Sequence, residues 1–210
     1  MRIARRRAMW YGCGALSVLL GCAGRPDIAN VDSKGTAIIC FGDSLTAGVG
    51  SSPAHDYPTR LSSRLGQPVI NAGVSGDTTR LALERLASDV LERHPRLVIV
   101  EFGGNDFLQR VPWSETFANL NTIVRIIQER GAMVVLVGVQ PGLFGDGARE
   151  EYRKIARARR TAFVPNILDG ILTEPQFKSD EIHPNDAGYE KIAQRIANAV
   201  EPLLRSPSQR

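Results

Sequence analysis

Residues 96–106 read RLVIVEFGGND, and this stretch decides the fold. Its first part, residues 96–102, is rich in Val and Ile and is apolar almost throughout, and it runs straight into a glycine-rich polar turn at residues 103–106. Other stretches with the composition of a strand are residues 36–41, 68–72, 132–139 and, more weakly, 162–165. Strands that are apolar along their whole length are covered on both faces, which is typical of a parallel sheet.

The strand-like stretches alternate with longer segments of helical character. Apolar residues recur at helical spacing from Leu81 to Leu91 and from Leu120 to Ile127. The expected helices cover residues 57–65, 78–93, 114–130, 148–160 and 185–204. Alternating strands and helices imply right-handed crossovers and a parallel sheet. We therefore expect an α/β domain with three layers, α/β/α, and about five parallel strands over residues 35–205.

The net positive charge of the chain comes from its first residues. Among 210 residues there are 26 Lys and Arg against 22 Asp and Glu. Four of the basic residues lie within residues 1–21, which hold no acidic residue, so subtracting them from 26 leaves 22 basic side chains against 22 acidic ones. A nucleic-acid partner is therefore not expected. With three His and three Cys at no metal-ligand spacing, neither a metal nor a cofactor is expected.

Residues 1–21 have the pattern of an export signal. Arginines at positions 2, 5, 6 and 7 precede an apolar run at residues 8–20, which is too short to span a bilayer comfortably. The sequence LLGC at residues 19–22 resembles a bacterial lipobox. We expect residues 1–21 to be a signal peptide and Cys22 to be lipidated. The alternatives are a cleaved signal peptide with an incidental cysteine, or an uncleaved anchor.

The segment after Cys22 predicts how and where the protein is attached. Residues 22–34 are mostly polar and lack periodicity, so we expect a lipidated cysteine followed by a tether. The lipid on Cys22 would attach the protein to a membrane of the bacterial cell envelope. Ala23 stands where an inner-membrane retention signal usually has Asp, which favours the outer membrane, facing the periplasm. The third cysteine, Cys40, lies in an apolar strand and is expected to be buried.

Polar motifs follow the first three expected strands, and a fourth precedes the last helix. They are GDSL at residues 42–45, NAGVSGD at 71–77, GGND at 103–106 and DEIHP at 180–184. Active sites in parallel α/β sheets gather at the carboxyl ends of the strands. The four motifs can therefore converge at one edge of the sheet.

The motifs contain the groups that acyl transfer requires. Ser44 lies on a tight turn between a strand and a helix, so its hydroxyl is expected to be exposed at the edge of the sheet. His183 precedes Pro184, which disfavours helical geometry and predicts a loop position. Asp180 is three residues upstream, so its carboxylate can contact one imidazole nitrogen while the other faces Ser44. We expect Ser44 to be the nucleophile, His183 the base and Asp180 the residue that orients it.

Together the four motifs resemble the conserved blocks of the SGNH/GDSL hydrolase family, and closely those of its bacterial thioesterase I/lysophospholipase/arylesterase branch. The resemblance runs from residue 38 to residue 203. It implies a flavodoxin-like sheet of order 2-1-3-4-5 and a triad of Ser44, Asp180 and His183. It also implies that the oxyanion is held by the backbone N–H groups of Ser44 and Gly73 and by the side-chain amide of Asn105.

Several residues near these motifs allow more than one interpretation. Phe107 and Leu108 follow the third motif directly and could line an acyl pocket or belong to the core. Asp77 is expected to cap the helix that follows it. Residues 140–147 are short and glycine-rich, and here the chain departs from the branch, whose members use this region to shape the acyl pocket.

The resulting functional hypothesis is a serine carboxylic ester hydrolase that cleaves acyl esters of small molecules or lipids. Two alternatives stay open. One is an O-deacetylase of envelope carbohydrates that uses the same triad, and the other is a non-catalytic envelope lipoprotein. The sequence leaves the acyl chain length and the oligomeric state undecided.

Overall fold

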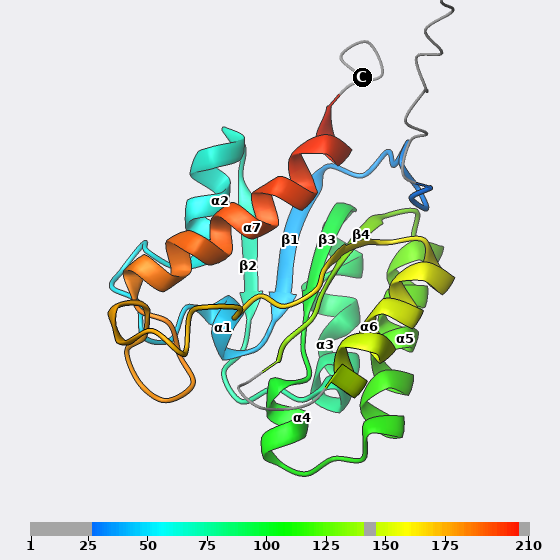
Figure 1. The fold of residues 1–210 in the computed structure, drawn as a ribbon. Helices are drawn as coiled ribbons and strands as arrows, with labels where there is room; N and C mark the ends of the chain where they lie inside the picture. The colour runs from blue at the N-terminus through cyan, green and yellow to red at the C-terminus, as the bar shows by residue number, and fades with distance from the viewer. Residues whose placement is uncertain (1–26, 141–145, 206–210) are drawn as a thin grey trace, which may run out of the picture.

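A computed structural model of the chain describes residues 27–140 and 146–205. The expected signal peptide and Cys22 lie outside the described residues. The five parallel strands have the order β2-β1-β3-β4-β5 (Figure 1), which confirms the flavodoxin-like arrangement. The strands are β1 (Ala37–Gly42), β2 (Val69–Gly73), β3 (Pro95–Glu101), β4 (Met133–Val137) and β5 (Ala162–Val164).

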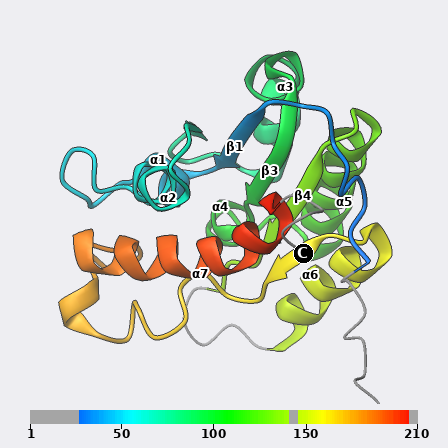
Figure 2. The ribbon, with the colours of Figure 1, turned by 90° about the horizontal axis from the view of Figure 1, so that it is seen from above.

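The described helices cover both faces of this sheet, as Figure 2 shows for α2 and α7 on one side and for α3 and α5 on the other. The α-helices are α1 (Ser44–Ala47), α2 (Tyr57–Leu65), α3 (Thr79–Asp89), α4 (Gly104–Leu108), α5 (Trp113–Glu129), α6 (Asp146–Arg159) and α7 (Asp186–Leu204). Two 3₁₀ turns are η1 (Leu91–Arg93) and η2 (Pro175–Phe177). The three-layer α/β/α prediction is therefore confirmed.

Alternating side chains of each central strand enter two separate cores. In β1, Ile38 and Cys40 pack with α2 and α7, whereas Ile39 and Phe41 pack with α3 and α5. This is the period of two that a strand imposes on its side chains, applied to a strand that is buried on both faces. Cys40 is fully buried, as expected.

The expected tether differs from the structure in its second half. Ile28 is 9% exposed and belongs to the core beneath α7. The side-chain amide of Asn30 donates to the carbonyl oxygens of Gln128 at 2.8 Å and Ala132 at 2.9 Å. Residues 28–30 are therefore packed against the domain, because an apolar side chain and a bonded amide fix them there. Among the residues that the structure describes, no helix has the length and apolar character needed to cross a bilayer.

The helix expected at residues 78–93 is interrupted. Helix α3 ends at Asp89, and Val90 leaves helical geometry with φ −127° before the short η1 turn. Two short helices, α1 and α4, were not expected. Four or five residues are too few to give a helical repeat of apolar side chains, and both helices begin inside the polar motifs.

Candidate active site

Ser44 is the first residue of α1, directly after the turn that ends β1. Asp43 caps this helix, since its side chain accepts a hydrogen bond from the Leu45 N–H at 3.0 Å. Gly42 makes the turn possible, because a Cβ there would lie 2.0 Å from Thr46 Oγ1. The sequence thus forces a tight turn that places the serine at the carboxyl end of the central strand.

The loop before α7 brings the other two predicted triad residues to this serine. His183 Nε2 lies 3.0 Å from Ser44 Oγ, and His183 Nδ1 lies 2.8 Å from Asp180 Oδ2. The second oxygen of Asp180 accepts the backbone N–H groups of Ile182 and His183, each at 2.8 Å, which closes a tight turn. Hydroxyl, imidazole and carboxylate therefore stand in hydrogen-bonding order, although Ser44 and His183 are 139 residues apart.

The hydrogen bonds around Asp180 favour its ionised form. Partial burial works to raise the pKa of Asp180, but the bonds from the Ile182 N–H and from the ring and N–H of His183 outweigh it and lower the pKa. The carboxylate therefore holds the imidazole with Nδ1 as donor and Nε2 as the acceptor that faces Ser44.

The three predicted oxyanion donors differ in whether they already donate a hydrogen bond within the protein. The Ser44 N–H has no hydrogen-bond partner among the described residues. The Gly73 N–H instead donates to Asn71 Oδ1 at 3.0 Å, so it is not available as expected. A Cβ at Gly73 would lie 2.1 Å from the Ala47 backbone nitrogen. Gly73 thus serves the close approach of β2 to α1.

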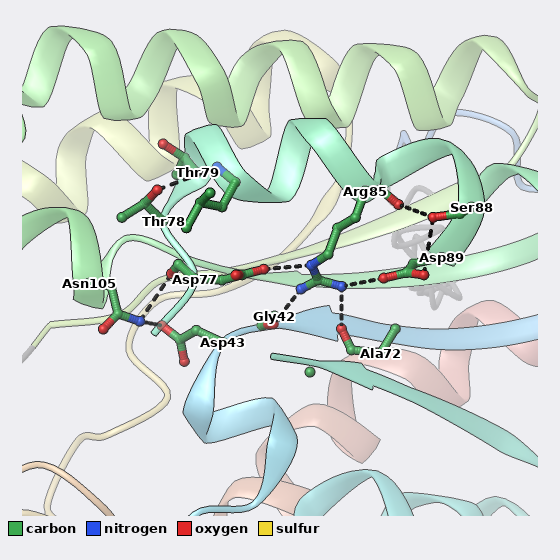
Figure 3. A network of polar contacts seen from close by, with 12 residues as sticks. Gly42, Asp43, Ala72, Asp77, Thr78, Thr79, Arg85, Ser88, Asp89 and Asn105 are labelled. Carbon is green, nitrogen blue, oxygen red and sulfur yellow. Dashed lines mark hydrogen bonds and ion pairs between the residues drawn. The ribbon is translucent and has the colours of Figure 1, made fainter. Parts of the chain in front are cut away.

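The Asn105 amide reaches the site but is engaged within the protein. Its Nδ2 donates to Asp43 Oδ2 at 3.1 Å and to the Asp77 carbonyl oxygen at 3.0 Å (Figure 3). These two bonds tie the first three motifs together. They also mean that the amide has no spare hydrogen until one acceptor is released.

Gly76 was missed by the sequence reasoning. It occupies the third position of a turn that is closed by the Asp77 N–H donating to the Val74 carbonyl at 3.2 Å, and its φ is +85°. Glycine suits this left-handed position, so Ser75-Gly76 is a local turn signal that the sequence contained. In the described part of the chain, its N–H has no partner.

The neighbouring aspartates act as anchors. Asp77 was expected to cap α3, but Thr78 is the cap, and the Asp77 carboxylate accepts from Arg85 Nε at 2.5 Å. Asp106 accepts the N–H and the hydroxyl of Thr79 at 2.9 and 2.5 Å, which links α4 to α3. These contacts fix the loops that carry the motifs.

A small hollow beside Ser44 has a mostly apolar lining. The apolar side chains that line it are Leu45, Leu108, Val139, Leu168 and Ile182. Leu108 therefore lies where an acyl chain could pack. Phe107 does not line the hollow as described and stacks on Trp113 instead, with ring centroids 5.9 Å apart. Of the two pocket residues that we predicted, only Leu108 is placed at the site.

A fully buried carboxyl group lies beneath the nucleophile turn and was also missed. Glu101, at the end of β3, pairs in register with Gly42, and its Oε2 accepts the Thr46 hydroxyl at 2.8 Å. Burial raises the pKa of Glu101 well above its ordinary value, and the nearby Asp43 charge raises it further. The fold therefore favours the neutral form of Glu101. The sequence did contain a signal for this residue, because Glu101 is the single acid in the largely apolar stretch RLVIVEF.

Comparison with known proteins shows the family of the chain. Residues 40–191 match the GDSL-like Lipase/Acylhydrolase family. Esterase TesA of Pseudomonas aeruginosa is 30% identical over 178 residues, which cover 80% of this chain and 89% of that protein. Thioesterase 1/protease 1/lysophospholipase L1 of Escherichia coli is 30% identical, covering 81% and 86%. Arylesterase of Vibrio mimicus is 32% identical, covering 78% and 87%.

The fold agrees as well. A crystal structure of TesA superposes with a TM-score of 0.75 at 30% identity and covers 80% of this chain and all of that one. A structure of the SGNH-hydrolase family esterase AlinE4 is 33% identical with a TM-score of 0.63, covering 82% and 98%. The chain belongs to the GDSL-like lipase/acylhydrolase family of ester hydrolases.

Proposed function

We propose that the protein cleaves acyl esters through an acyl-enzyme intermediate on Ser44, with His183 as general base and Asp180 as its orienting carboxylate. The observation that carries the proposal is the continuous contact from Ser44 Oγ through the two ring nitrogens of His183 to Asp180, at 3.0 and 2.8 Å. Each contact is within the reach that proton transfer needs.

The contacts define the order of the steps. His183 Nε2 removes the proton from Ser44 Oγ as the oxygen attacks the ester carbonyl, and Asp180 stabilises the imidazolium that forms. The tetrahedral intermediate collapses, the acyl group stays on Ser44, and His183 gives its proton to the leaving alcohol. Water, deprotonated by His183, then attacks the acyl-enzyme and releases the carboxylic acid.

The available backbone donors support a revised oxyanion hole. The N–H groups of Ser44 and Gly76 have no partner in the described part of the chain, so we assign them as the first two donors. Asn105 must first release Asp43 or the Asp77 carbonyl oxygen, so we infer that it contributes only once substrate has entered. Loss of one oxyanion donor costs roughly 10²–10³ in kcat.

The apolar hollow supports a substrate with a hydrocarbon acyl group. Leu108 and Ile182 are the large, exposed side chains that flank the triad, and neither offers a hydrogen bond to a sugar. The names of the relatives point in the same direction, since they are an esterase, a thioesterase/protease/lysophospholipase and an arylesterase. We therefore place short to medium acyl esters and lysophospholipids ahead of acetylated carbohydrates.

A panel of esters tests this proposal. The panel contains p-nitrophenyl esters of increasing acyl length, a lysophospholipid and an acetylated oligosaccharide, each measured with the wild type and with Ser44→Ala. We expect kcat/KM to rise beyond the acetyl ester, and Ser44→Ala to lose turnover while it keeps its circular dichroism spectrum. Activity confined to the acetylated oligosaccharide would favour the deacetylase, and equal turnover by Ser44→Ala would remove the mechanism.

We propose further that Cys22 is lipidated and attaches the enzyme to the envelope, on the outer membrane facing the periplasm. The motif at residues 19–22 supports this. Because Ile28 is already part of the core, residues 22–28 span at most about 20 Å when extended. The domain would then lie close to the lipid surface. Metabolic labelling with an alkynyl fatty acid should mark the wild type and leave Cys22→Ser unlabelled.

A further inference from the structure

Arg85, on the inner side of α3, is bonded through each nitrogen of its guanidinium. Nε donates to Asp77 Oδ2 at 2.5 Å, and Nη2 donates to the Gly42 carbonyl oxygen at 2.9 Å. Nη1 donates to the Ala72 carbonyl oxygen and to Asp89 Oδ2, both at 2.9 Å (Figure 3). The four hydrogen bonds of this side chain thus reach the ends of β1 and β2, the loop that holds Asp77, and the helix that carries Arg85.

The two carbonyl groups lie where the strands leave the sheet. Gly42 is the last residue of β1 and stands two residues before Ser44, and Ala72 is the penultimate residue of β2. Asp77 lies at the far end of the loop that follows β2. Arg85 therefore holds this loop at both ends and holds the nucleophile turn at its first residue.

The same contacts extend to the third motif through Asn105. The backbone oxygen of Asp77 accepts the Asn105 amide, which also donates to Asp43, next to the nucleophile. We propose that Arg85 is a positioning residue. It holds the nucleophile turn, between Gly42 and Ser44, and the loop after β2, which holds Gly76 and Asp77, in the relative position that catalysis needs. This inference rests on the proposed esterase function, since it assigns no chemistry of its own to Arg85.

The surroundings of Arg85 require a guanidinium. The group is planar, and its donors point in fixed directions that match two carbonyl oxygens and two carboxylates at once. It also lies 4.4 Å above the centre of the Phe41 ring, a contact that favours a flat, weakly hydrated cation. The side chain is 16% exposed, so most of its charge is balanced by Asp77 and Asp89 rather than by water. A lysine would supply the positive charge but not N–H donors that point in these fixed directions.

Arg85→Met tests the proposal, with Arg60→Met as the matched control. Arg60 is similarly buried, at 20% exposure, and it donates from Nε to the His55 carbonyl at 2.9 Å and pairs with Glu190, on α2 and α7. Both variants lose an ion pair and a bond to a backbone carbonyl, but of the two arginines only Arg85 contacts the motif residues. The readouts are kcat, KM, the pH dependence of kcat/KM and the melting temperature.

We expect Arg85→Met to lower kcat roughly 10- to 100-fold, because small displacements of positioned groups cost that much. KM and the midpoint of the pH profile should stay at their wild-type values, since the triad and the apolar hollow are untouched. Arg60→Met should lose thermal stability and keep its kcat. A kcat of Arg85→Met within about two-fold of the wild type would overturn the proposal.

Arg85→Lys keeps the test decisive if the methionine variant fails to fold. It retains the charge beside Asp77 and Asp89, and we expect its kcat to remain well below that of the wild type because an ammonium cannot reach both carbonyls. Full activity in Arg85→Lys would show that charge alone suffices and would overturn the inference. The wild type and Ser44→Ala, measured alongside, test the esterase function itself, so the two ideas fail separately.

Discussion

At the scale of single residues, Glu101 is an acid whose pKa the fold raises well above its ordinary value. It is fully buried at the end of β3, one of its oxygens accepts from Thr46, and the other has no partner among the described residues. Burial is the main cause that raises the pKa of this carboxyl group, so the fold favours its neutral form. The apolar strand therefore carries an acid with a raised pKa directly behind the nucleophile turn.

The raised pKa values of Glu101 and its neighbour Asp43 make stability depend on pH. The pKa of Glu101 in the folded protein lies above its ordinary value of 4.5, and burial raises that of Asp43 to about 6 from 3.8. The folded state thus binds more protons than the unfolded state above about pH 4, so stability should fall as the pH rises from about 4 through 6. Glu101→Gln, which mimics the neutral acid, should flatten this decline. Denaturant unfolding at several pH values measures it, and an unchanged slope would show that Glu101 is ionised.

Asp180 differs from Glu101 because it is half exposed and already ionised. Asp180 contributes to catalysis by orienting the imidazole of His183. An asparagine whose oxygen accepts the two backbone N–H groups would turn its own N–H toward Nδ1 and would no longer accept a hydrogen bond from it. We expect Asp180→Asn to bind substrate normally and to lose roughly 10³–10⁴ in kcat. Steady-state kinetics on a p-nitrophenyl ester would show this loss of kcat. An unchanged kcat with a higher KM would argue against the triad.

At the scale of elements, the segment before β1 is a part of the fold that we expected to be a free tether. Asn30 has φ +60°, and its amide bonds two carbonyl groups, at the end of α5 and just before β4. Asn30→Gly would retain the left-handed backbone and lose both bonds, for a destabilisation of about 1–3 kcal/mol. Asn30→Ala should be less stable still, because alanine tolerates that backbone poorly. Thermal unfolding of the two variants would test this order.

The elements also show where sequence is sufficient. Helix α2 covers Tyr57–Leu65 as predicted, because Asp56 caps its start and Gly66 ends it in a left-handed conformation. These signals are local. The hydrogen bond from the Gly73 N–H to the side chain of Asn71 was not predictable from the sequence. Either glycine of the NAGVSGD motif could supply an oxyanion N–H, and only the position of the Asn71 side chain distinguishes them.

The same distinction explains the triad and the anchors. Ser44 and His183 were predictable because a neighbouring residue defines the turn or loop at each: Gly42 before the start of α1, and Pro184 after His183. The partner of Asp77 was not predictable, because Arg85 is eight residues away on the inner side of a helix, and which side chain reaches a loop depends on the packing of α3 against the sheet.

At the scale of the whole molecule, the described N-terminal segment and the active site lie at opposite ends of the sheet. Residues 27–36 run along the amino ends of the strands, whereas α1 and α4 lie at their carboxyl ends (Figure 1). The proposed lipid on Cys22 is therefore separable from the chemistry. We expect Cys22→Ser to move the enzyme from the membrane fraction to the soluble fraction with unchanged kcat on a soluble ester. Fractionation followed by an activity assay would measure both.

The packing of Ile28 has a consequence for which molecules such an enzyme would meet. With Ile28 in the core, the proposed anchor on Cys22 would attach near the end of the sheet opposite the active site, an orientation in which the mouth of the active site faces the aqueous compartment. Esters that diffuse through that compartment, or that are displayed on an opposing surface, would arrive unhindered. Lipids of the anchoring leaflet would first have to leave it.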